Sequence, residues 1–155
     1  MATHRYQAVV EWKRNGQNFL GHQYHRDHRW AFDGGIEISA SASPLIVATP
    51  QSNDKAVDPE EALIAAASSC HMLWFLSMAA DRGVVVDSYR DEAVGLLERN
   101  PEGRMAITVI TLRPVVEFSG NSKPARRDLE VLHQLAHDRC FIANSLKSDF
   151  RIEVI

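Results

Sequence analysis

The stretch DPEEALIAAASSCHMLWFLSMAADRG, residues 58–83, constrains the fold more than any other part of the chain. Asp58 is a good helix N-cap, Pro59 suits the first helical position, and Glu61 stands where a capping box needs it. Gly83 is a typical helix stop. The apolar side chains between these signals point all round the helix axis instead of forming one stripe. The sequence therefore predicts a central helix that protein covers on every side.

Strand patterns lie on both sides of this helix. RYQAVVEW (5–12), HRWAF (28–32) and IEISA (36–40) are rich in β-formers and are separated by Asn-Gly and Asp-Gly-Gly turn signals. After the helix, the segments 84–98 and 105–118 are joined by the turn sequence RNPEGR, so we expect a long hairpin. The sequence predicts a three-stranded start and a later hairpin.

The remaining segments complete the predicted architecture. Residues 41–57 contain two prolines and no sustained period, and we expect a loop that passes close to the functional region. Residues 150–155 read as a final strand. From about residue 124 apolar residues recur at helical spacing, which places Cys140 on the inward face of a second helix or at a break in it. We therefore expect a single α+β domain over 1–155, with antiparallel sheets packed on two helices.

The composition excludes several classes of protein. The chain has 155 residues, of which 45% are hydrophobic, enough for one globular domain with a core. A net charge of -3 with scattered Lys and Arg argues against nucleic acid as a partner. No signal peptide is visible, and the longest strongly apolar run, Met72 to Leu76, is too short to cross a bilayer. The sequence predicts a soluble, cytoplasmic protein without a membrane partner.

Two cysteines, Cys70 and Cys140, are too few for a secreted disulfide framework or a thiolate zinc site. If they react, we expect them to react as a pair. A metal site is an alternative, because His133 and His137 would share one helical face. Further candidate ligands for it are Cys140, His22, His25 and His28. Since no carboxylate-rich second shell is visible, the sequence predicts neither a metal nor a cofactor.

Cys70 is either a small core residue or a nucleophile. A thiol with a pKa of about 8.5 is mostly protonated at neutral pH, and burial in an apolar helix raises such a pKa. Cys70 lies roughly 18 Å along the helix from the cap, beyond the reach of the helix dipole. A nucleophilic role therefore requires a cation, and arginine suits it because it stays charged and can also bind a carboxylate.

Three segments resemble motifs of the OsmC/Ohr family, the osmotically inducible and organic hydroperoxide resistance proteins. They are DPEEALIAAASSC with Glu60 and Cys70 ten residues apart, RDHRWAFDGG with Arg26, and AHDRCFIANSLK with Cys140. The resemblance implies an OsmC-like fold and an interwoven homodimer. It also implies that Cys70, Cys140, Arg26 and Glu60 form the site, with Arg14 and Arg29 as rival arginines.

The resemblance implies a thiol-dependent peroxidase for organic hydroperoxides. Cys70 would become a sulfenic acid, condense with Cys140 to a disulfide, and be reduced by an external dithiol. Glu60 and Cys70 are about 15 Å apart along one helix, so an arginine bound to both requires a composite site between two protomers. Phe141 and His71 stand where the family commonly has proline and an aromatic residue. Two alternatives remain open: a non-catalytic dimer that binds an apolar ligand or a protein partner, and a metal-binding or structural dimer.

Overall fold

The computed structural model describes residues 3–120 and 123–155. The chain divides into two compact units, the first ending at Ala62 and the second beginning at Leu63. This border falls inside helix α1 (Pro59–Asp81), whose first turn belongs to the first unit. One helix thus belongs to both units, and the single domain over 1–155 stays a prediction.

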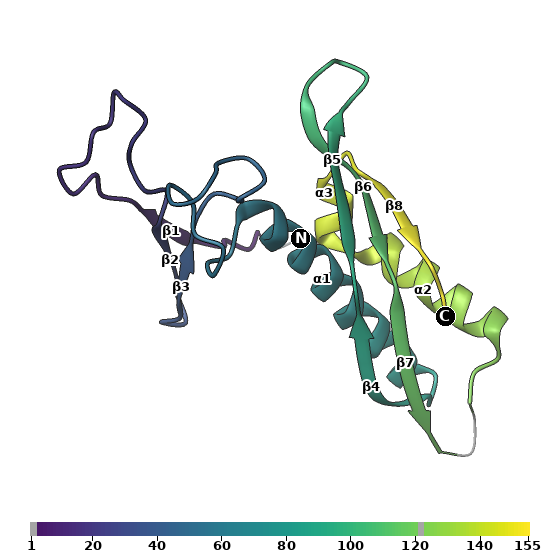
Figure 1. The fold of residues 1–155 in the computed structure, drawn as a ribbon. Helices are drawn as coiled ribbons and strands as arrows, with labels where there is room; N and C mark the ends of the chain where they lie inside the picture. The colour runs from purple at the N-terminus through teal and green to yellow at the C-terminus, as the bar shows by residue number, and fades with distance from the viewer. Residues whose placement is uncertain (1–2, 121–122) are drawn as a thin grey trace. The chain divides into compact units, whose positions relative to one another are not determined.

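The first unit contains a small antiparallel sheet. Its strands are β1 (Ala8–Glu11), β2 (His28–Phe32) and β3 (Glu37–Ala40), in the order β1-β2-β3 (Figure 1). This confirms the predicted three-stranded start, although β1 is shorter than 5–12 because only Ala8–Glu11 pair with β2. Residues 41–57 form the predicted loop of turns and bends.

Helix α1 begins and ends at the predicted signals. The backbone N–H of Glu61 donates to Asp58 Oδ1 (2.8 Å), and the N–H of Asp58 donates to Glu61 Oε2 (3.5 Å), which completes the capping box. Gly83 has φ +69°, and the N–H of Val84 bonds to the carbonyl of Ala79 (2.9 Å). A left-handed glycine therefore stops the helix, as the sequence indicates.

The second unit contains the predicted hairpin. The strands of this unit are β4 (Val85–Asp91), β5 (Val94–Arg99), β6 (Met105–Leu112), β7 (Pro114–Ser119) and β8 (Asp149–Ile152). β5 pairs with β6 and β4 pairs with β7, both antiparallel, so the two arms form one long ribbon with short breaks. The final strand, β8, pairs with β6 in parallel and is shorter than the predicted 150–155.

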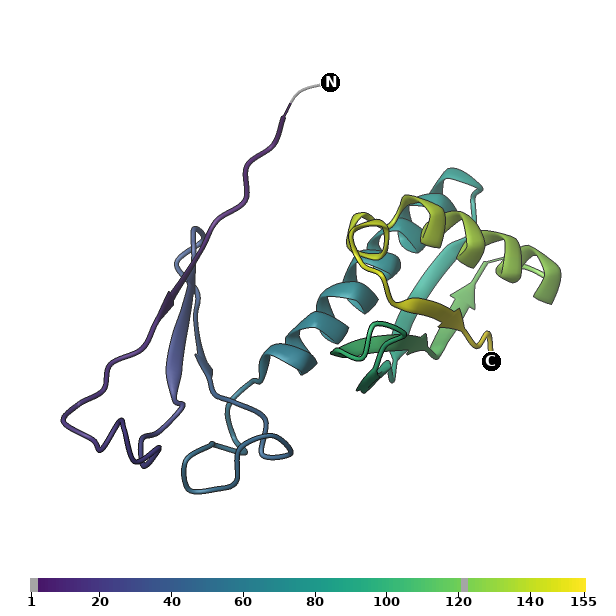
Figure 2. The ribbon, with the colours of Figure 1, turned by 90° about the horizontal axis from the view of Figure 1, so that it is seen from above.

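Two further helices complete this unit, α2 (Arg126–Arg139) and α3 (Phe141–Ser145). Figures 1 and 2 show α2 and the part of α1 in this unit on the same face of the hairpin. Their shared core consists of Phe75, Met78, Ala79, Leu132 and Ala136. Cys140 lies between α2 and α3, which confirms its predicted place at a break.

One chain by itself does not cover α1 on every side, so the complete cover of this helix stays a prediction that depends on a partner chain. Its buried residues within the chain are Ala67, His71, Phe75, Met78 and Ala79, while Leu73 is 60% exposed. Among the described residues, α1 is also the helix long and apolar enough to span a membrane, because alanines extend the apolar length beyond Met72 to Leu76. A core helix of a soluble protein passes the same test.

Candidate redox site

The structure brings the two cysteines together. Cys70 lies on α1 and is partly buried, whereas Cys140 is 1% exposed at the junction of α2 and α3. The thiol of Cys70 lies near enough to that of Cys140 to raise its pKa, and both are free thiols. The two sulfur atoms are thus neighbours although they stand 70 residues apart in the sequence.

Cys140 is held as a neutral thiol. Burial raises its pKa to about 11, and the hydrogen bond and charge of Cys70 act in the same direction, while the N–H of Ala143 partly opposes them. Cys140 Sγ accepts that N–H at 3.4 Å and lies 3.9 Å from the carbonyl oxygen of Ala67. At neutral pH, Cys140 therefore keeps its proton.

Aromatic side chains stand next to both cysteines. Trp74 follows Cys70 by one helical turn, and its ring meets that of Phe141 edge to face with centroids 5.5 Å apart. The guanidinium carbon of Arg139 lies 5.8 Å from the centre of the Trp74 ring. Phe141 is 66% exposed, so an apolar surface with a neighbouring cation adjoins the dithiol. The sequence interpretation did not include Arg139 among the candidate cations, although it directly precedes Cys140.

A pair of buried histidines lies on the same two helices. His71 Nε2 and His133 Nδ1 are 3.0 Å apart, and both residues are almost completely buried. Burial lowers the pKa of each to about 4. His71 also replaces the aromatic residue of the resembled motif, and here its imidazole belongs to the interior. No local pattern predicts this contact, because the two residues are 62 positions apart.

The metal alternative gains no support from this arrangement. Nowhere in 3–120 or 123–155 do three or more His, Cys, Asp or Glu side chains gather as a metal would require. His133 bonds to His71, and the ring of His137 contacts that of Phe150. Both imidazoles of α2 thus lie against other rings, and His137 Nδ1 is buried without a hydrogen-bond partner among the described residues.

Arg26 is fixed within the first loop. Its Nη1 donates to the carbonyl of His22 (3.1 Å) and to the carbonyl of Tyr24, and its guanidinium lies 3.8 Å from the centre of the Tyr24 ring. The backbone N–H of Arg26 bonds to the carbonyl of Gln51 (2.8 Å), so the loop 41–57 does pass beside this arginine. No carboxylate neutralises the guanidinium among the described residues.

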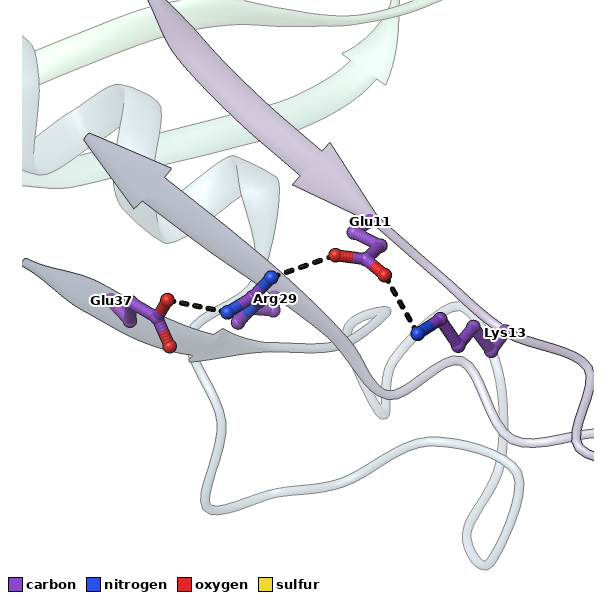
Figure 3. A network of polar contacts seen from close by, with 4 residues as sticks. All are labelled: Glu11, Lys13, Arg29 and Glu37. Carbon is purple, nitrogen blue, oxygen red and sulfur yellow. Dashed lines mark hydrogen bonds and ion pairs between the residues drawn. The ribbon is translucent and has the colours of Figure 1, made fainter. Parts of the chain in front are cut away.

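Arg29 stands in a different environment. Figure 3 shows its guanidinium between Glu11 and Glu37 on the three-stranded sheet, with Lys13 on the other oxygen of Glu11. The Arg29 to Glu11 distance is 2.7 Å, and the bonds to Glu37 and Glu11 raise the pKa of Arg29 further above its usual range. Two carboxylates neutralise the charge of the Arg29 guanidinium and occupy its N–H donors, so Arg29 is poorly suited to stabilise a thiolate. Arg26 is therefore the better of these two candidates.

The remaining predicted residues are Glu60 and Arg14. Glu60 lies in the first turn of α1, and within the described ranges no hydrogen bond or ion pair joins it to Arg26. The carbonyl of Arg14 accepts the N–H of Gln17 in a turn (3.1 Å). Arg26 and Glu60 belong to the first unit and the two cysteines to the second. One chain thus assembles the thiol pair, and the Arg26–Glu60 pair stays a prediction.

Comparisons with known proteins give the family. The model of the OsmC-like protein family matches residues 52–155. An OsmC-like protein of unknown function from Vibrio cholerae is 51% identical, with a TM-score of 0.97 over 99% of this chain and all of that one. No curated protein matches the chain.

Two more distant structures share the fold. The organic hydroperoxide resistance protein OhrB of Bacillus subtilis has a TM-score of 0.71 at 16% identity, over 99% of this chain and 100% of its own. An organic hydroperoxide resistance protein from Elizabethkingia anophelis has the same score at 14% identity, over 99% and 95%. The family match and the V. cholerae relative leave one conclusion: the chain belongs to the OsmC-like protein family.

Proposed function

We propose that this protein is a thiol-dependent peroxidase that reduces organic hydroperoxides to alcohols through a Cys70 sulfenic acid and a Cys70–Cys140 disulfide. The observation that carries the proposal is the proximity of two free thiols that differ in burial. The partly buried thiol can meet a substrate, and the fully buried thiol stands ready to react with the product formed on its neighbour.

The proposed reaction has three steps. The thiolate of Cys70 attacks the terminal peroxide oxygen, so that an S–O bond forms, the O–O bond breaks, and the departing alkoxide takes up a proton to become the alcohol. The sulfur of Cys140 then attacks the sulfur of Cys70, the S–O bond breaks, and the hydroxide leaves as water with the Cys140 proton. An external dithiol reduces the disulfide by thiol–disulfide exchange.

The electrostatics of the pair favour this division of roles. The charge of a Cys70 thiolate raises the pKa of Cys140, so the two thiols do not ionise together. When Cys70 becomes a neutral sulfenic acid, that repulsion disappears and the pKa of Cys140 falls. Cys140 therefore becomes a better nucleophile once Cys70 has been oxidised, which is when the reaction needs it.

The apolar surface beside the thiols favours an organic hydroperoxide over hydrogen peroxide. Trp74 and the exposed Phe141 provide aromatic contact area for an apolar group. The names of the B. subtilis and E. anophelis proteins point to the same class of substrate, and at their low identity they share the fold alone.

The cation of the site would come from a second protomer. Arg26 would stabilise the Cys70 thiolate and Glu60 would orient Arg26, in a composite site of a homodimer. The exposed face of α1 supports such a dimer, because a monomer would leave apolar side chains such as Leu73 in water. We further propose a cytoplasmic location, where an external dithiol is available, and a reaction that needs neither metal nor cofactor.

A thiol titration tests this function. Adding stoichiometric cumene hydroperoxide to the reduced protein should consume both thiols rapidly, whereas adding zinc should leave both thiols available to a thiol reagent. Thiols that persist in the presence of the hydroperoxide would contradict the peroxidase and favour a non-catalytic dimer that binds an apolar ligand on Trp74 and Phe141. A matched control is Leu45→Ala, which trims an exposed side chain of the 41–57 loop.

A further inference from the structure

His71 and His133 form a buried bridge between the two helices that carry the thiols. His71 directly follows Cys70 on α1, and His133 lies on α2, whose C-terminal cap is Cys140. The two imidazoles are 1% and 2% exposed, with Nε2 of the first 3.0 Å from Nδ1 of the second. Among the described residues, this is the one side-chain hydrogen bond that joins α1 to α2.

The direction of this bond follows from the second nitrogen of His71. Both imidazoles are neutral at pH 7, because burial lowers the pKa of each, so one ring must donate and the other accept. His71 Nδ1 is sealed from water and has no partner within the described ranges. A buried lone pair without a donor costs less than a buried N–H without an acceptor. His71 Nε2–H therefore donates to His133 Nδ1.

The surroundings of the bridge exclude water and supply one charge. The ring of Phe75 stacks on that of His133 with centroids 4.3 Å apart. His137 faces His71, and the carboxylate of Asp91 faces His133 from β4. Asp91 is itself bonded to the hydroxyl of Ser68 and to the N–H of Arg113. Tyr89 Oη is also buried nearby on β4 without a partner among the described residues. A hydrogen bond in a site that is sealed from water is stronger than one exposed to water.

We propose that His71 and His133 are positioning residues that hold α1 and α2 at the separation from which Cys140 closes on Cys70. This inference rests on the proposed use of the two thiols as a redox pair. A disulfide tolerates a narrow range of Cα separation and dihedral angle, and each sulfur here belongs to a different helical segment. The hydrogen bond between His71 and His133 is directional, so it restricts how far the two helices can rotate or slide against each other. Apolar packing alone restricts these movements less.

Closure of the dithiol can be measured without any peroxide. Oxidised glutathione forms a mixed disulfide with Cys70 and releases one glutathione. Cys140 then attacks the Cys70 sulfur, the internal S–S bond forms, and the second glutathione leaves. The rate constant of this second step, followed by mass spectrometry after acid quenching, reports how often the two sulfurs reach bonding geometry.

We expect His71→Leu and His133→Leu each to slow closure about three- to tenfold, which corresponds to the loss of one net hydrogen bond. The double variant should be no slower than either single variant, because both remove the same bond. His71→Gln keeps a donor near the Nε2 position and should retain most of the wild-type rate. His71→Asn, whose shorter amide does not reach His133, should behave like His71→Leu and serves if the leucine variants do not fold.

Val86→Ala is the matched control for stability, since it trims the same hydrophobic core on β4 and leaves both imidazoles in place. It should close at the wild-type rate. Closure in His71→Leu and His71→Asn that is as fast as in Val86→Ala would overturn the inference, as would a wild-type protein that never closes. The two proposals can also fail separately. If the histidine variants close the disulfide slowly but the wild-type protein does not reduce hydroperoxides, the positioning role is upheld and the peroxidase is contradicted.

Discussion

The thiol of Cys70 lies close to that of Cys140, which stands at the junction of α2 and α3, and the two differ in their access to solvent. Cys70 is partly buried on α1, whereas Cys140 is sealed and carries a pKa raised to about 11 by burial. This difference assigns the first reaction with a substrate to Cys70 and the second, internal reaction to Cys140.

The first prediction concerns the oxidised product. Oxidation by one equivalent of hydroperoxide should link Cys70 and Cys140 within one chain, because no other thiol exists and these two are neighbours. In Cys140→Ser, oxidation should stop at a Cys70 sulfenic acid that dimedone traps. Peptide mapping by mass spectrometry distinguishes these products. A dimedone adduct on Cys140 of the wild-type protein, or a disulfide between chains, would contradict the assignment.

The second prediction concerns the arginine. Arg26→Ala should slow alkylation of Cys70 by iodoacetamide at pH 7 and slow its oxidation about ten- to a hundredfold, because a charge-assisted contact to the thiolate is lost. Glu60→Gln should do the same more weakly, since the guanidinium keeps its charge and loses its orientation. Circular dichroism checks that both variants fold.

Three other arginines provide the controls for that experiment. Arg29→Ala should leave the reactivity of Cys70 unchanged, because Glu11 and Glu37 already neutralise Arg29. Arg14→Ala should also have no effect. Arg139, which lies over the Trp74 ring, is the strongest rival. If Arg139→Ala slows Cys70 and Arg26→Ala does not, the cation belongs to the same unit as the thiols and the composite site is wrong.

The third prediction concerns the oligomeric state. We expect a homodimer in solution, since α1 leaves Leu73 60% exposed on a face otherwise formed by small residues. Leu73→Asp should weaken the dimer, because a carboxylate on that face would be desolvated against the partner. Val131→Asp, at a similarly exposed position on α2, is the control. Sedimentation equilibrium giving a 17.4 kDa monomer for the wild type would rule out the dimer.

The fourth prediction is a loss of stability in mild acid. The pKa of His71 and of His133 falls from about 6.5 in the unfolded chain to about 4 in the native protein, so between these pH values the unfolded chain binds more protons. The contribution of these two histidines to the free energy of unfolding is therefore fully present above about pH 6.5 and is lost as the pH falls toward 4. The expected loss is on the order of 2 kcal/mol per histidine between pH 7 and pH 5.

Urea unfolding at the two pH values measures this dependence. The variant with both His71→Leu and His133→Leu should have a clearly flatter profile, because its unfolded state no longer takes up these two protons. An equally steep profile in that variant would assign the acid sensitivity to other groups. His4→Leu, near the start of the chain, controls for removal of a histidine that carries no buried bond.

Local signals allowed much of the fold to be predicted. Asp58, Glu61 and Gly83 define both ends of α1 because capping and left-handed turns depend on a few neighbouring residues. The two hairpins followed from alternating β-formers around turn sequences. The parallel pairing of β8 with β6 was not foreseen, since nothing within either strand encodes which distant edge it joins.

The candidate site was also predictable only in part. Cys70 and Cys140 were proposed from their motifs, and their proximity could be expected once both helices faced one core. The bridge between His71 and His133 and the stacking of Arg139 near Trp74 depend on how α1 and α2 pack, which spacing in the sequence does not reveal. The all-round apolar pattern of α1 indicates more cover than one chain gives, and for this reason we expect a partner chain on that face.

Single-turnover reduction of cumene hydroperoxide tests the central claim most directly. The reduced protein, mixed with one equivalent of the peroxide, should release cumyl alcohol in a fast phase whose amplitude equals the concentration of Cys70. The same phase should persist in Cys140→Ser and disappear in Cys70→Ser. Alcohol released by Cys70→Ser at the wild-type rate would show that Cys70 is not the nucleophile and would contradict the account.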